Sequence, residues 1–152
     1  MRVAPLGLVQ AWAPATAFIV AAQSAAITHG HPSGYLSAAA MAAMVRMLVD
    51  DMDLLAAADK AVALLSNDLE ADETISALRA ATGMWRERPT DHASAVERLS
   101  EGWVGEEALA VGVYAALAGQ SFREVFAIAA THDGESDSTA SIADNSTARG
   151  RG

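Results

Sequence analysis

The sequence predicts an all-α fold, and three observations lead to this prediction. Hydrophobic residues make up 52% and charged residues 19% of the 152 residues, a composition that can form a buried core. Alanine, which has the highest helix propensity, supplies much of the apolar content, and the chain has only four prolines. Apolar positions recur at helical spacing, and no stretch shows the alternation typical of strands. We therefore expect an orthogonal helical bundle.

The first predicted helices are marked by punctuation and periodicity. Pro14 opens the first helix, and the region of Gly30 and Pro32 ends it. The second carries an apolar stripe at i, i+4 and i+7 spacing, which needs a packing partner. Acidic residues lie in the first turns of the third and fourth, where the helix dipole favours them. We expect these helices at residues 14–27, 33–49, 53–65 and 72–85.

The later helices have clearer end signals. A short helix at residues 91–99 follows Pro89, and the helix at residues 106–118 ends at Gly119, a residue suited to the left-handed C-terminal position. Ser121 and Glu124 have the spacing of a capping box, which predicts a helix at residues 122–130. The last helix is expected at residues 138–143.

The end of the chain differs in character from the rest. Residues 144–152, DNSTARGRG, have no apolar residue besides Ala148. Such a segment has little apolar surface to bury, so it is expected to form a flexible tail. We predict one domain at residues 1–143, followed by this tail.

Net charge and cysteine content exclude several classes of function. The net charge of −9 and the pI near 4.7 argue against a nucleic-acid backbone or an anionic membrane as partner. The absence of cysteine excludes disulfides, thiolate chemistry and Cys-ligated zinc. These features are consistent with a cytoplasmic protein, which is the location we expect.

The stretch at residues 11–27 is the candidate for membrane insertion or export. Pro14, Gln23 and Ser24 interrupt it, and it is shorter than the roughly 20 apolar residues that a span requires. A buried helix is the favoured interpretation. A signal peptide is the alternative, although only Arg2 supplies a charge near the start and no clear cleavage site follows.

The run HDGESDSTASIA, residues 132–143, gathers oxygen-bearing side chains where a loop turns into the last helix. Carboxylates and a hydroxyl are the ligands that Mg²⁺ selects, and here they are supplied by Glu135, Asp137 and Ser138, followed by Thr139. The alternative is an acidic helix start with Ser136 or Asp137 as N-cap and no ion. On the pattern alone, this alternative is the more common structure.

The histidines at residues 29 and 31 lie in a loop that contains glycine and proline. Two histidines at this spacing could bind a transition metal. No cysteine or nearby carboxylate completes a zinc site, so a polar loop role is the default interpretation.

Four segments, in this order, look like blocks of one known family: MRVAPLGL, SAAITHGHPSGY, EGWVGEEALAVGVYAAL and SFREVFAIAATHDGESDSTASIA. They resemble the ADP-ribosylglycohydrolase family, whose C-terminal metal motif is Gly-Asp-x-Asp-Ser/Thr before a helix of small residues. The resemblance extends from Met1 to about Ala143, and residues 50–100 match poorly. It implies the helical fold of that family.

The resemblance also implies a reaction and a set of site residues. The reaction is hydrolysis of the glycosidic bond between ADP-ribose and a protein side chain or related acceptor, with a pair of Mg²⁺ ions. By resemblance, half of the metal site comes from Glu135, Asp137 and Ser138, and His29 contacts the ADP-ribose. His31 and the catalytic residues stay unassigned.

Two further residues, Trp103 and Glu107, match the family block that contains them. At their helical spacing we interpret them as packing and loop-bracing residues.

The chain departs from the family pattern at two places. Family members have a longer N-terminal part, with a Thr-Asp-Asp motif and a glycine-rich segment that are not found in this sequence, which begins at Met1 and Arg2. At Glu135 the family has Asp, and the extra methylene moves the carboxylate about 1.5 Å outward. We therefore expect a fold truncated at the N-terminus, a weak or partial Mg²⁺ site and little hydrolytic activity.

Three other expectations concern alternatives and partners. The chain could be a non-catalytic helical module that binds ADP-ribose or a nucleotide. It could also be one subunit of a split enzyme, completed by an N-terminal polypeptide. Helix faces left without partners would favour self-association.

Overall fold

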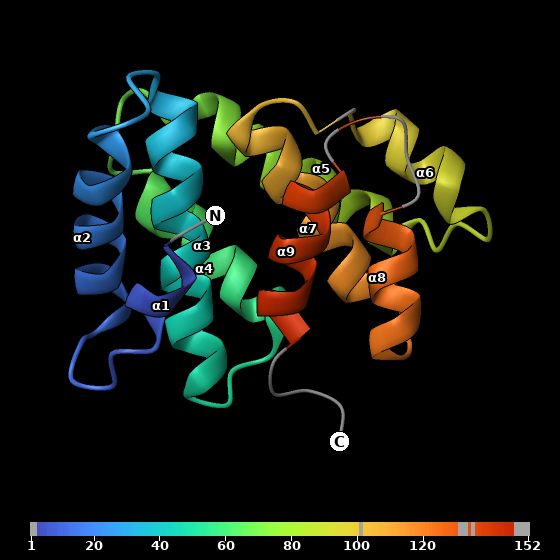
Figure 1. Ribbon diagram of the computed structural model, residues 1–152, viewed down its shortest axis with the longest axis horizontal. Helices are drawn as coiled ribbons and strands as arrows, with labels where there is room; N and C mark the ends of the chain where they lie inside the picture. The colour runs from blue at the N-terminus through green and yellow to red at the C-terminus, as the bar shows by residue number, and fades with distance from the viewer. Residues whose placement is uncertain (1–2, 101, 131–133, 135, 148–152) are drawn as a thin grey trace. The chain divides into compact units, whose positions relative to one another are not determined.

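The computed structural model describes residues 3–100, 102–130, 134 and 136–147, and the segments that carry secondary structure there are all helical (Figure 1). This confirms the all-α prediction. The chain divides into two compact units, Met1–Ile75 and Ser76–Gly152. The single domain at residues 1–143 therefore stays a prediction.

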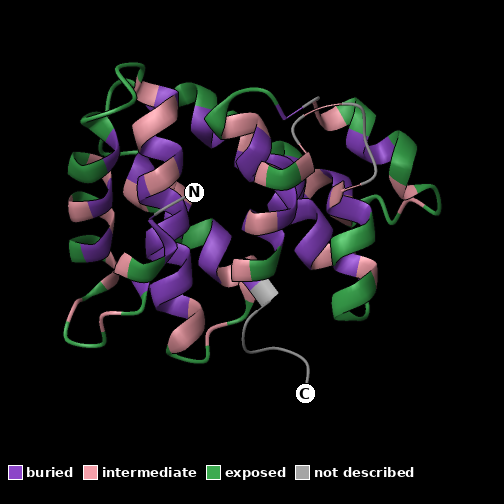
Figure 2. Ribbon diagram, in the orientation of Figure 1, coloured by how far each residue is buried: buried purple, intermediate pink, exposed green. Residues whose placement is uncertain are grey.

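The first unit is built around one long helix, α3. The unit contains α1 (Ala4–Gly7), α2 (Pro14–Ala26), α3 (Pro32–Val49), α4 (Leu54–Leu65) and the start of α5 (Asp72–Arg86). Helix α3 packs against α1, α2 and α4, and most of its central residues are buried (Figure 2). The predicted apolar stripe is buried at Leu36, Ala40 and Met44, but burial extends around the whole helix, as expected for a central element.

Helix α1, which the sequence does not predict as a separate element, depends on a close approach to α3. A Cβ atom at Gly7 would lie 2.5 Å from the carbonyl oxygen of Ala42 and 2.7 Å from Cβ of Val45. Glycine is therefore required where the two helices meet.

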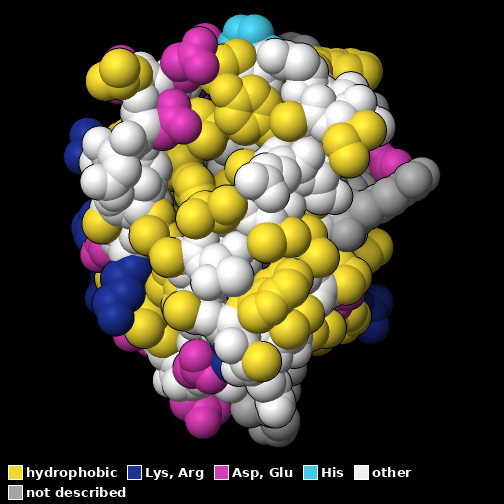
Figure 3. Space-filling view, turned by 90° about the vertical axis from the view of Figure 1, so that its left-hand side faces the viewer, with side chains coloured by type: hydrophobic (Ala, Val, Ile, Leu, Met, Phe, Trp, Pro, Cys, Tyr) yellow, Lys and Arg dark blue, Asp and Glu magenta, His cyan; other side chains and the backbone are white. Residues whose placement is uncertain are grey.

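Helix α2 is buried along one face only, which corrects the expectation of a buried helix. Ala17, Ala21 and Ala25 face the core, whereas the side chains of Ile19 and Ile27 are 54% and 83% exposed. Figure 3 shows this side of the molecule, where hydrophobic and uncharged side chains cover most of the surface. No helix among the described residues reaches the length and hydropathy that a bilayer crossing requires.

The second unit is organised around α7. It contains most of α5, together with α6 (His92–Leu99), α7 (Gly105–Ala118), α8 (Phe122–Ala130) and α9 (Ser136–Thr147). Helix α7 packs against α6, α8 and α9, and Tyr114 is its largest fully buried side chain. At the crossing of α7 and α9, a Cβ atom at Gly112 would lie 2.7 Å from Cβ of Ile142.

Helices α4 and α6 begin with aspartate caps, at Asp53 and Asp91. Oδ1 of Asp53 accepts a hydrogen bond from the backbone N–H of Ala56 at 3.0 Å. Oδ1 of Asp91 likewise accepts from the N–H of Ser94 at 3.2 Å. These contacts satisfy N–H groups that have no partner within a first helical turn.

In the capping box, Oγ of Ser121 accepts from the N–H of Glu124 at 3.2 Å, as predicted. The Glu124 carboxylate accepts from the N–H of Gln120 at 2.7 Å, one residue before the cap. The box is therefore confirmed, with its second bond shifted by one residue.

Helix α7 ends at Ala118, as predicted, but the conformation of Gly119 and the end of α9 differ from the prediction. Gly119 is extended (φ −67°, ψ 144°) and not left-handed, and glycine is needed there because a Cβ would lie 2.6 Å from Cγ2 of Val125. Helix α9 continues beyond residue 143 to Thr147, where a tail was expected. Its last turns are supported by side chains that bond back to the helix, from Asn145 to the Ser141 carbonyl and from Ser146 to the Ile142 carbonyl. Residues 148–152 lie outside the described residues.

Candidate cation-binding turn and neighbouring sites

Two of the predicted metal ligands, Asp137 and Ser138, lie in the first turn of α9. The helix begins at Ser136, whose backbone N–H donates to the carbonyl of Gly134 at 2.9 Å. Asp137 is exposed on the first turn, and its Oδ1 accepts from the N–H of Ser138 at 2.8 Å. Asp137 and Ser138 therefore lie together on this turn, while Glu135 lies outside the described residues.

Thr139 fixes this turn to the rest of the second unit. Its side chain is fully buried, and its hydroxyl lies 2.5 Å from the carbonyl oxygen of Ala129 in α8 and 3.1 Å from that of Ser136. A hydroxyl bonded to two carbonyls in the interior faces away from solvent. Thr139 is therefore an anchor, and the oxygen donors on the exposed side are Asp137 and Ser138.

The donor set of the described residues does not fit a two-metal centre. Mg²⁺ takes near-octahedral coordination by oxygen atoms. Over the described part of the chain, no three His, Cys, Asp or Glu side chains gather in a way that could hold a metal ion. Asp137 is the carboxylate of the described first turn, and one of its oxygens already accepts a backbone hydrogen bond.

His29 belongs to the first unit, and Asp137 and Ser138 belong to the second. It lies in the exposed loop between α2 and α3, where its Nδ1 is 2.8 Å from Oγ1 of Thr28. A Cβ atom at Gly34 would lie 3.0 Å from Cβ of His29, so the small residue leaves room for the histidine against the first turn of α3.

His31 has a local structural role. It is the N-cap of α3, and its Nδ1 lies 3.4 Å from the backbone N of Ser33 and 3.7 Å from Oε2 of Glu73. These contacts agree with a polar loop role.

Trp103 and Glu107 were interpreted together as packing and loop-bracing residues; a contact between them braces the loop, whereas the Trp103 side chain is not buried. Oε2 of Glu107 accepts from the backbone N–H of Trp103 at 3.0 Å and thereby holds the loop before α7. The indole of Trp103 is 60% exposed. The family block is thus held by a carboxylate–backbone contact, while the aromatic ring faces solvent.

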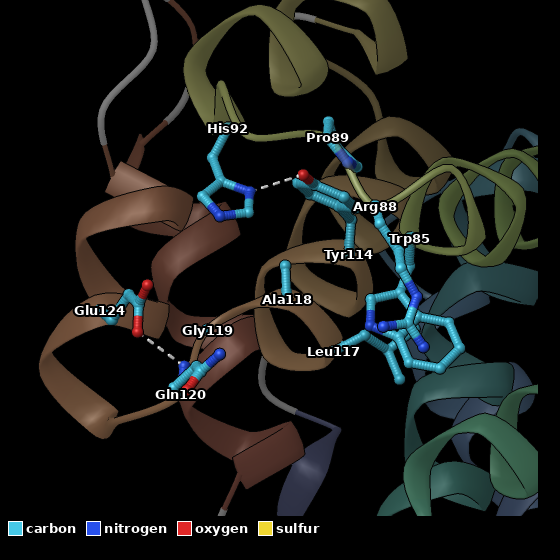
Figure 4. A pocket seen from close by; sticks show the side chains of 10 residues that line it. All are labelled: Trp85, Arg88, Pro89, His92, Tyr114, Leu117, Ala118, Gly119, Gln120 and Glu124. Carbon is cyan, nitrogen blue, oxygen red and sulfur yellow. Dashed lines mark hydrogen bonds between the residues drawn. The ribbon is translucent and has the colours of Figure 1, made fainter.

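A pocket of about 500 Å³ in the second unit is lined by none of the predicted site residues (Figure 4). On its wall, Nδ1 of His92 lies 2.8 Å from the Tyr114 hydroxyl. Burial, with a smaller contribution from the charge of Asp91, raises the pKa of Tyr114 above its usual 10.0. The sequence interpretation assigns no role to His92 or Tyr114, because 22 residues separate them and no short motif joins them.

The described residues form an all-helical protein in which the first turn of α9 carries several oxygen donors. The sequence pattern of ADP-ribosylglycohydrolase matches residues 1–144, so the chain belongs to the ADP-ribosylglycohydrolase family. No curated protein and no solved structure was found to match the chain. The family resemblance of the four sequence blocks is thereby confirmed.

Proposed function

We propose that this chain recognises ADP-ribosyl groups and that its reaction class is hydrolysis of the glycosidic bond between ADP-ribose and an acceptor. The observation that carries the proposal is the family match, which includes both the loop of His29 and the first turn of α9. In this proposal His29 contacts the ligand. Asp137 and Ser138 supply oxygen donors to a partial Mg²⁺ site, together with Glu135.

We further propose that hydrolysis by this polypeptide alone is slow. In the described residues the first turn of α9 offers one carboxylate, Asp137, and the hydroxyls beside it. A cation held by so few protein ligands keeps most of its water and binds weakly. The same observation favours a second candidate function, a helical module that binds ADP-ribose without turning over a glycosidic bond.

Binding measurements test the recognition step separately from turnover. Calorimetric titration with ADP-ribose, with and without Mg²⁺, should detect binding that Mg²⁺ strengthens. Asp137→Asn should remove the strengthening because it removes a carboxylate and keeps the shape of the side chain.

A matched control is available on the same helix. Asp144→Asn makes the same charge change on an exposed residue of α9 and should leave the effect of Mg²⁺ intact. Absence of any ADP-ribose binding, or an equal loss in both variants, would contradict the proposal.

A further inference from the structure

The pocket beside α7 lies within one compact unit and combines a hydrophobic wall with two opposite charges. Its lining comes from the end of α5 and the residues after it, the start of α6, the end of α7 and the start of α8. A volume of about 500 Å³ is in the range that holds small organic ligands. The residues that give it chemical character are Trp85, Arg88, His92, Tyr114, Leu117 and Glu124.

Arg88 supplies the positive charge. It follows α5 in the left-handed conformation, with φ 52°, and its backbone N–H donates to the Trp85 carbonyl at 3.1 Å. A non-glycine residue in this conformation is uncommon, and here it turns the chain so that the guanidinium reaches the pocket (Figure 4). Within the described part of the chain, the Arg88 side chain makes no hydrogen bond or ion pair.

Glu124 supplies the negative charge on the other side of the pocket, with Ala118 and Gly119 between it and Arg88 (Figure 4). Its Oε2 accepts from the N–H of Gln120 at 2.7 Å, which fixes the carboxylate. Over the described residues, its Oε1 has no protein partner. Because Glu124 is only partly exposed, its carboxylate interacts with a ligand in a less polar medium than open water.

The end of α7 adds to the negative potential near Glu124. Helix α7 ends at Ala118, and the last carbonyl groups of a helix carry partial negative charge. Leu117 and Ala118 form an apolar surface between the two charged side chains, and the Trp85 indole lines the side of Arg88. A cationic group therefore fits beside Glu124, and an anionic group fits beside Arg88.

His92 and Tyr114 form a fixed polar pair on the wall of the pocket. The buried Tyr114 hydroxyl is hydrogen-bonded to His92 and stays protonated at neutral pH, since its pKa is raised. The second ring nitrogen of His92 faces the side on which Glu124 lies (Figure 4). It adds hydrogen-bonding capacity to the pocket.

We propose that this pocket binds a small zwitterion, in which an ammonium group and a carboxylate are joined by an aliphatic chain. The ammonium contacts Glu124 and the end of α7, the carboxylate contacts Arg88, and the aliphatic chain packs on Leu117 and Ala118. A simple anion would face Glu124, and a simple cation would face Arg88. Each would bind less tightly than a ligand that pairs with both charges.

The test is a titration series with ω-amino acids, performed on the whole chain in EDTA so that it does not depend on a metal or on ADP-ribose. The probes are 4-aminobutyrate, 6-aminohexanoate and 8-aminooctanoate, with hexanoate and hexylammonium as single-charge controls. We expect one chain length to bind with a dissociation constant of about 1 mM or below. Both single-charge probes should bind about tenfold more weakly.

Charge-removing variants identify the end of the ligand that each residue binds. Glu124→Gln keeps an oxygen for the contact with Gln120 and should weaken the best zwitterion about tenfold, while binding of hexanoate does not fall. Arg88→Gln should weaken the zwitterion equally, while binding of hexylammonium does not fall. Glu97→Gln and Arg123→Gln, which change exposed residues outside the pocket, should bind like the parent chain.

Three results would overturn the proposal. They are no binding of any ω-amino acid at about 10 mM, equal affinity for the zwitterion and a single-charge probe, or equal losses in the control variants. Circular dichroism of each variant shows whether the helical fold is retained. If the chain binds ω-amino acids as expected but does not bind ADP-ribose, only the proposed function is contradicted.

Discussion

Thr139 determines where the oxygen donors of α9 lie. Its hydroxyl joins the first turn of α9 to the Ala129 carbonyl of α8, and its side chain is fully buried. Asp137 and Ser138 precede it on the same turn, so their positions depend on this contact. A buried hydroxyl–carbonyl contact is costly to break because the acceptor would lose its partner in the interior.

Replacement of Thr139 tests this anchor. Thr139→Val keeps the branched shape and removes the O–H donor, so the free energy of unfolding should fall by about 1–3 kcal/mol in urea denaturation. Thr139→Ser keeps the donor and should lose less. An unfolding free energy of the valine variant equal to that of the parent chain would show that the contact does not hold the turn.

Gly112 sets the distance between α7 and α9. Gly112→Ala would place a Cβ 2.7 Å from Cβ of Ile142 and 3.2 Å from the Ala143 backbone N. The helices must separate, so we expect the free energy of unfolding to fall by about 1–3 kcal/mol and the Tm to be lower. Gly83→Ala is the matched control. Nothing lies within 4 Å of its Cβ position in α5, and alanine should stabilise the helix by up to about 1 kcal/mol.

Tyr114 gives the chain an alkaline pH dependence. Its folded pKa is raised, so the folded state holds the phenolic proton more tightly than the unfolded state. This stability is present below the unfolded pKa of about 10 and is lost as the pH rises toward the folded pKa. Burial and the charges of Glu70 and Asp68 also raise the pKa of Tyr35, so Tyr35 acts in the same direction.

Tyr114→Phe should therefore make the free energy of unfolding, measured by urea titration, less dependent on pH between about pH 9 and 11. At pH 7 the free energy of unfolding of the same variant should be lower by about 1 kcal/mol, because the hydrogen bond to His92 is removed. An unchanged alkaline slope would contradict this account of Tyr114. Tyr35→Phe provides the comparison for the partly exposed tyrosine.

Individual contacts were predictable where the signal was local in sequence. Asp137 and Ser138 are adjacent, and the contact of Glu107 with the Trp103 backbone spans four residues. The pairing of His92 with Tyr114 joins two helices and depends on how α6 packs on α7, which a sequence pattern does not contain. The exposed indole of Trp103 was missed for the same reason, because its burial depends on neighbours distant in sequence.

At the scale of elements, most helices begin and end within one or two residues of the predicted positions. Prolines and capping residues mark the starts, and their contacts are local: Asp53 precedes α4, Asp91 precedes α6, and Ser121 precedes α8. Two features that the sequence does not predict depend on tertiary packing. Helix α1 forms against α3, and Gly119 approaches Val125 of α8 in an extended conformation that no end signal predicts.

The cap of α4 provides a test at this scale. Asp53→Ala removes the acceptor for the Ala56 N–H and should lower the unfolding free energy by about 1 kcal/mol. Asp53→Asn keeps an acceptor and should retain most of that stability. Asp59→Ala, an exposed change in the middle of α4, should be neutral or slightly stabilising. If Asp53→Ala behaves like Asp59→Ala in thermal unfolding, the cap does not contribute.

For the whole molecule, the all-helical class followed from composition and periodicity, whereas the division into two units did not. Periodicity shows that a helix buries one face, but it does not name the partner. The sequence therefore did not predict the packing partners of the two central helices. Helix α3 packs against α1, α2 and α4, and α7 packs against α6, α8 and α9.

Charge is distributed unevenly along the chain. All 19 acidic residues lie at or after Asp50, and no Asp, Glu, Lys or Arg occurs between Arg2 and Arg46. Uncharged side chains therefore cover much of the face that α2 presents (Figure 3). An uncharged face of this kind favours contact with another protein surface over exposure to solvent. Self-association of the chain stays a prediction.

We propose that this member of the ADP-ribosylglycohydrolase family recognises ADP-ribosyl groups but hydrolyses the glycosidic bond slowly on its own. The most direct measurement is the rate at which the purified chain releases ADP-ribose from an ADP-ribosylated arginine peptide in excess Mg²⁺. We expect a rate close to that of the Asp137→Asn variant and of the reaction without protein. Turnover of about 1 s⁻¹ or faster, abolished by Asp137→Asn, would contradict it.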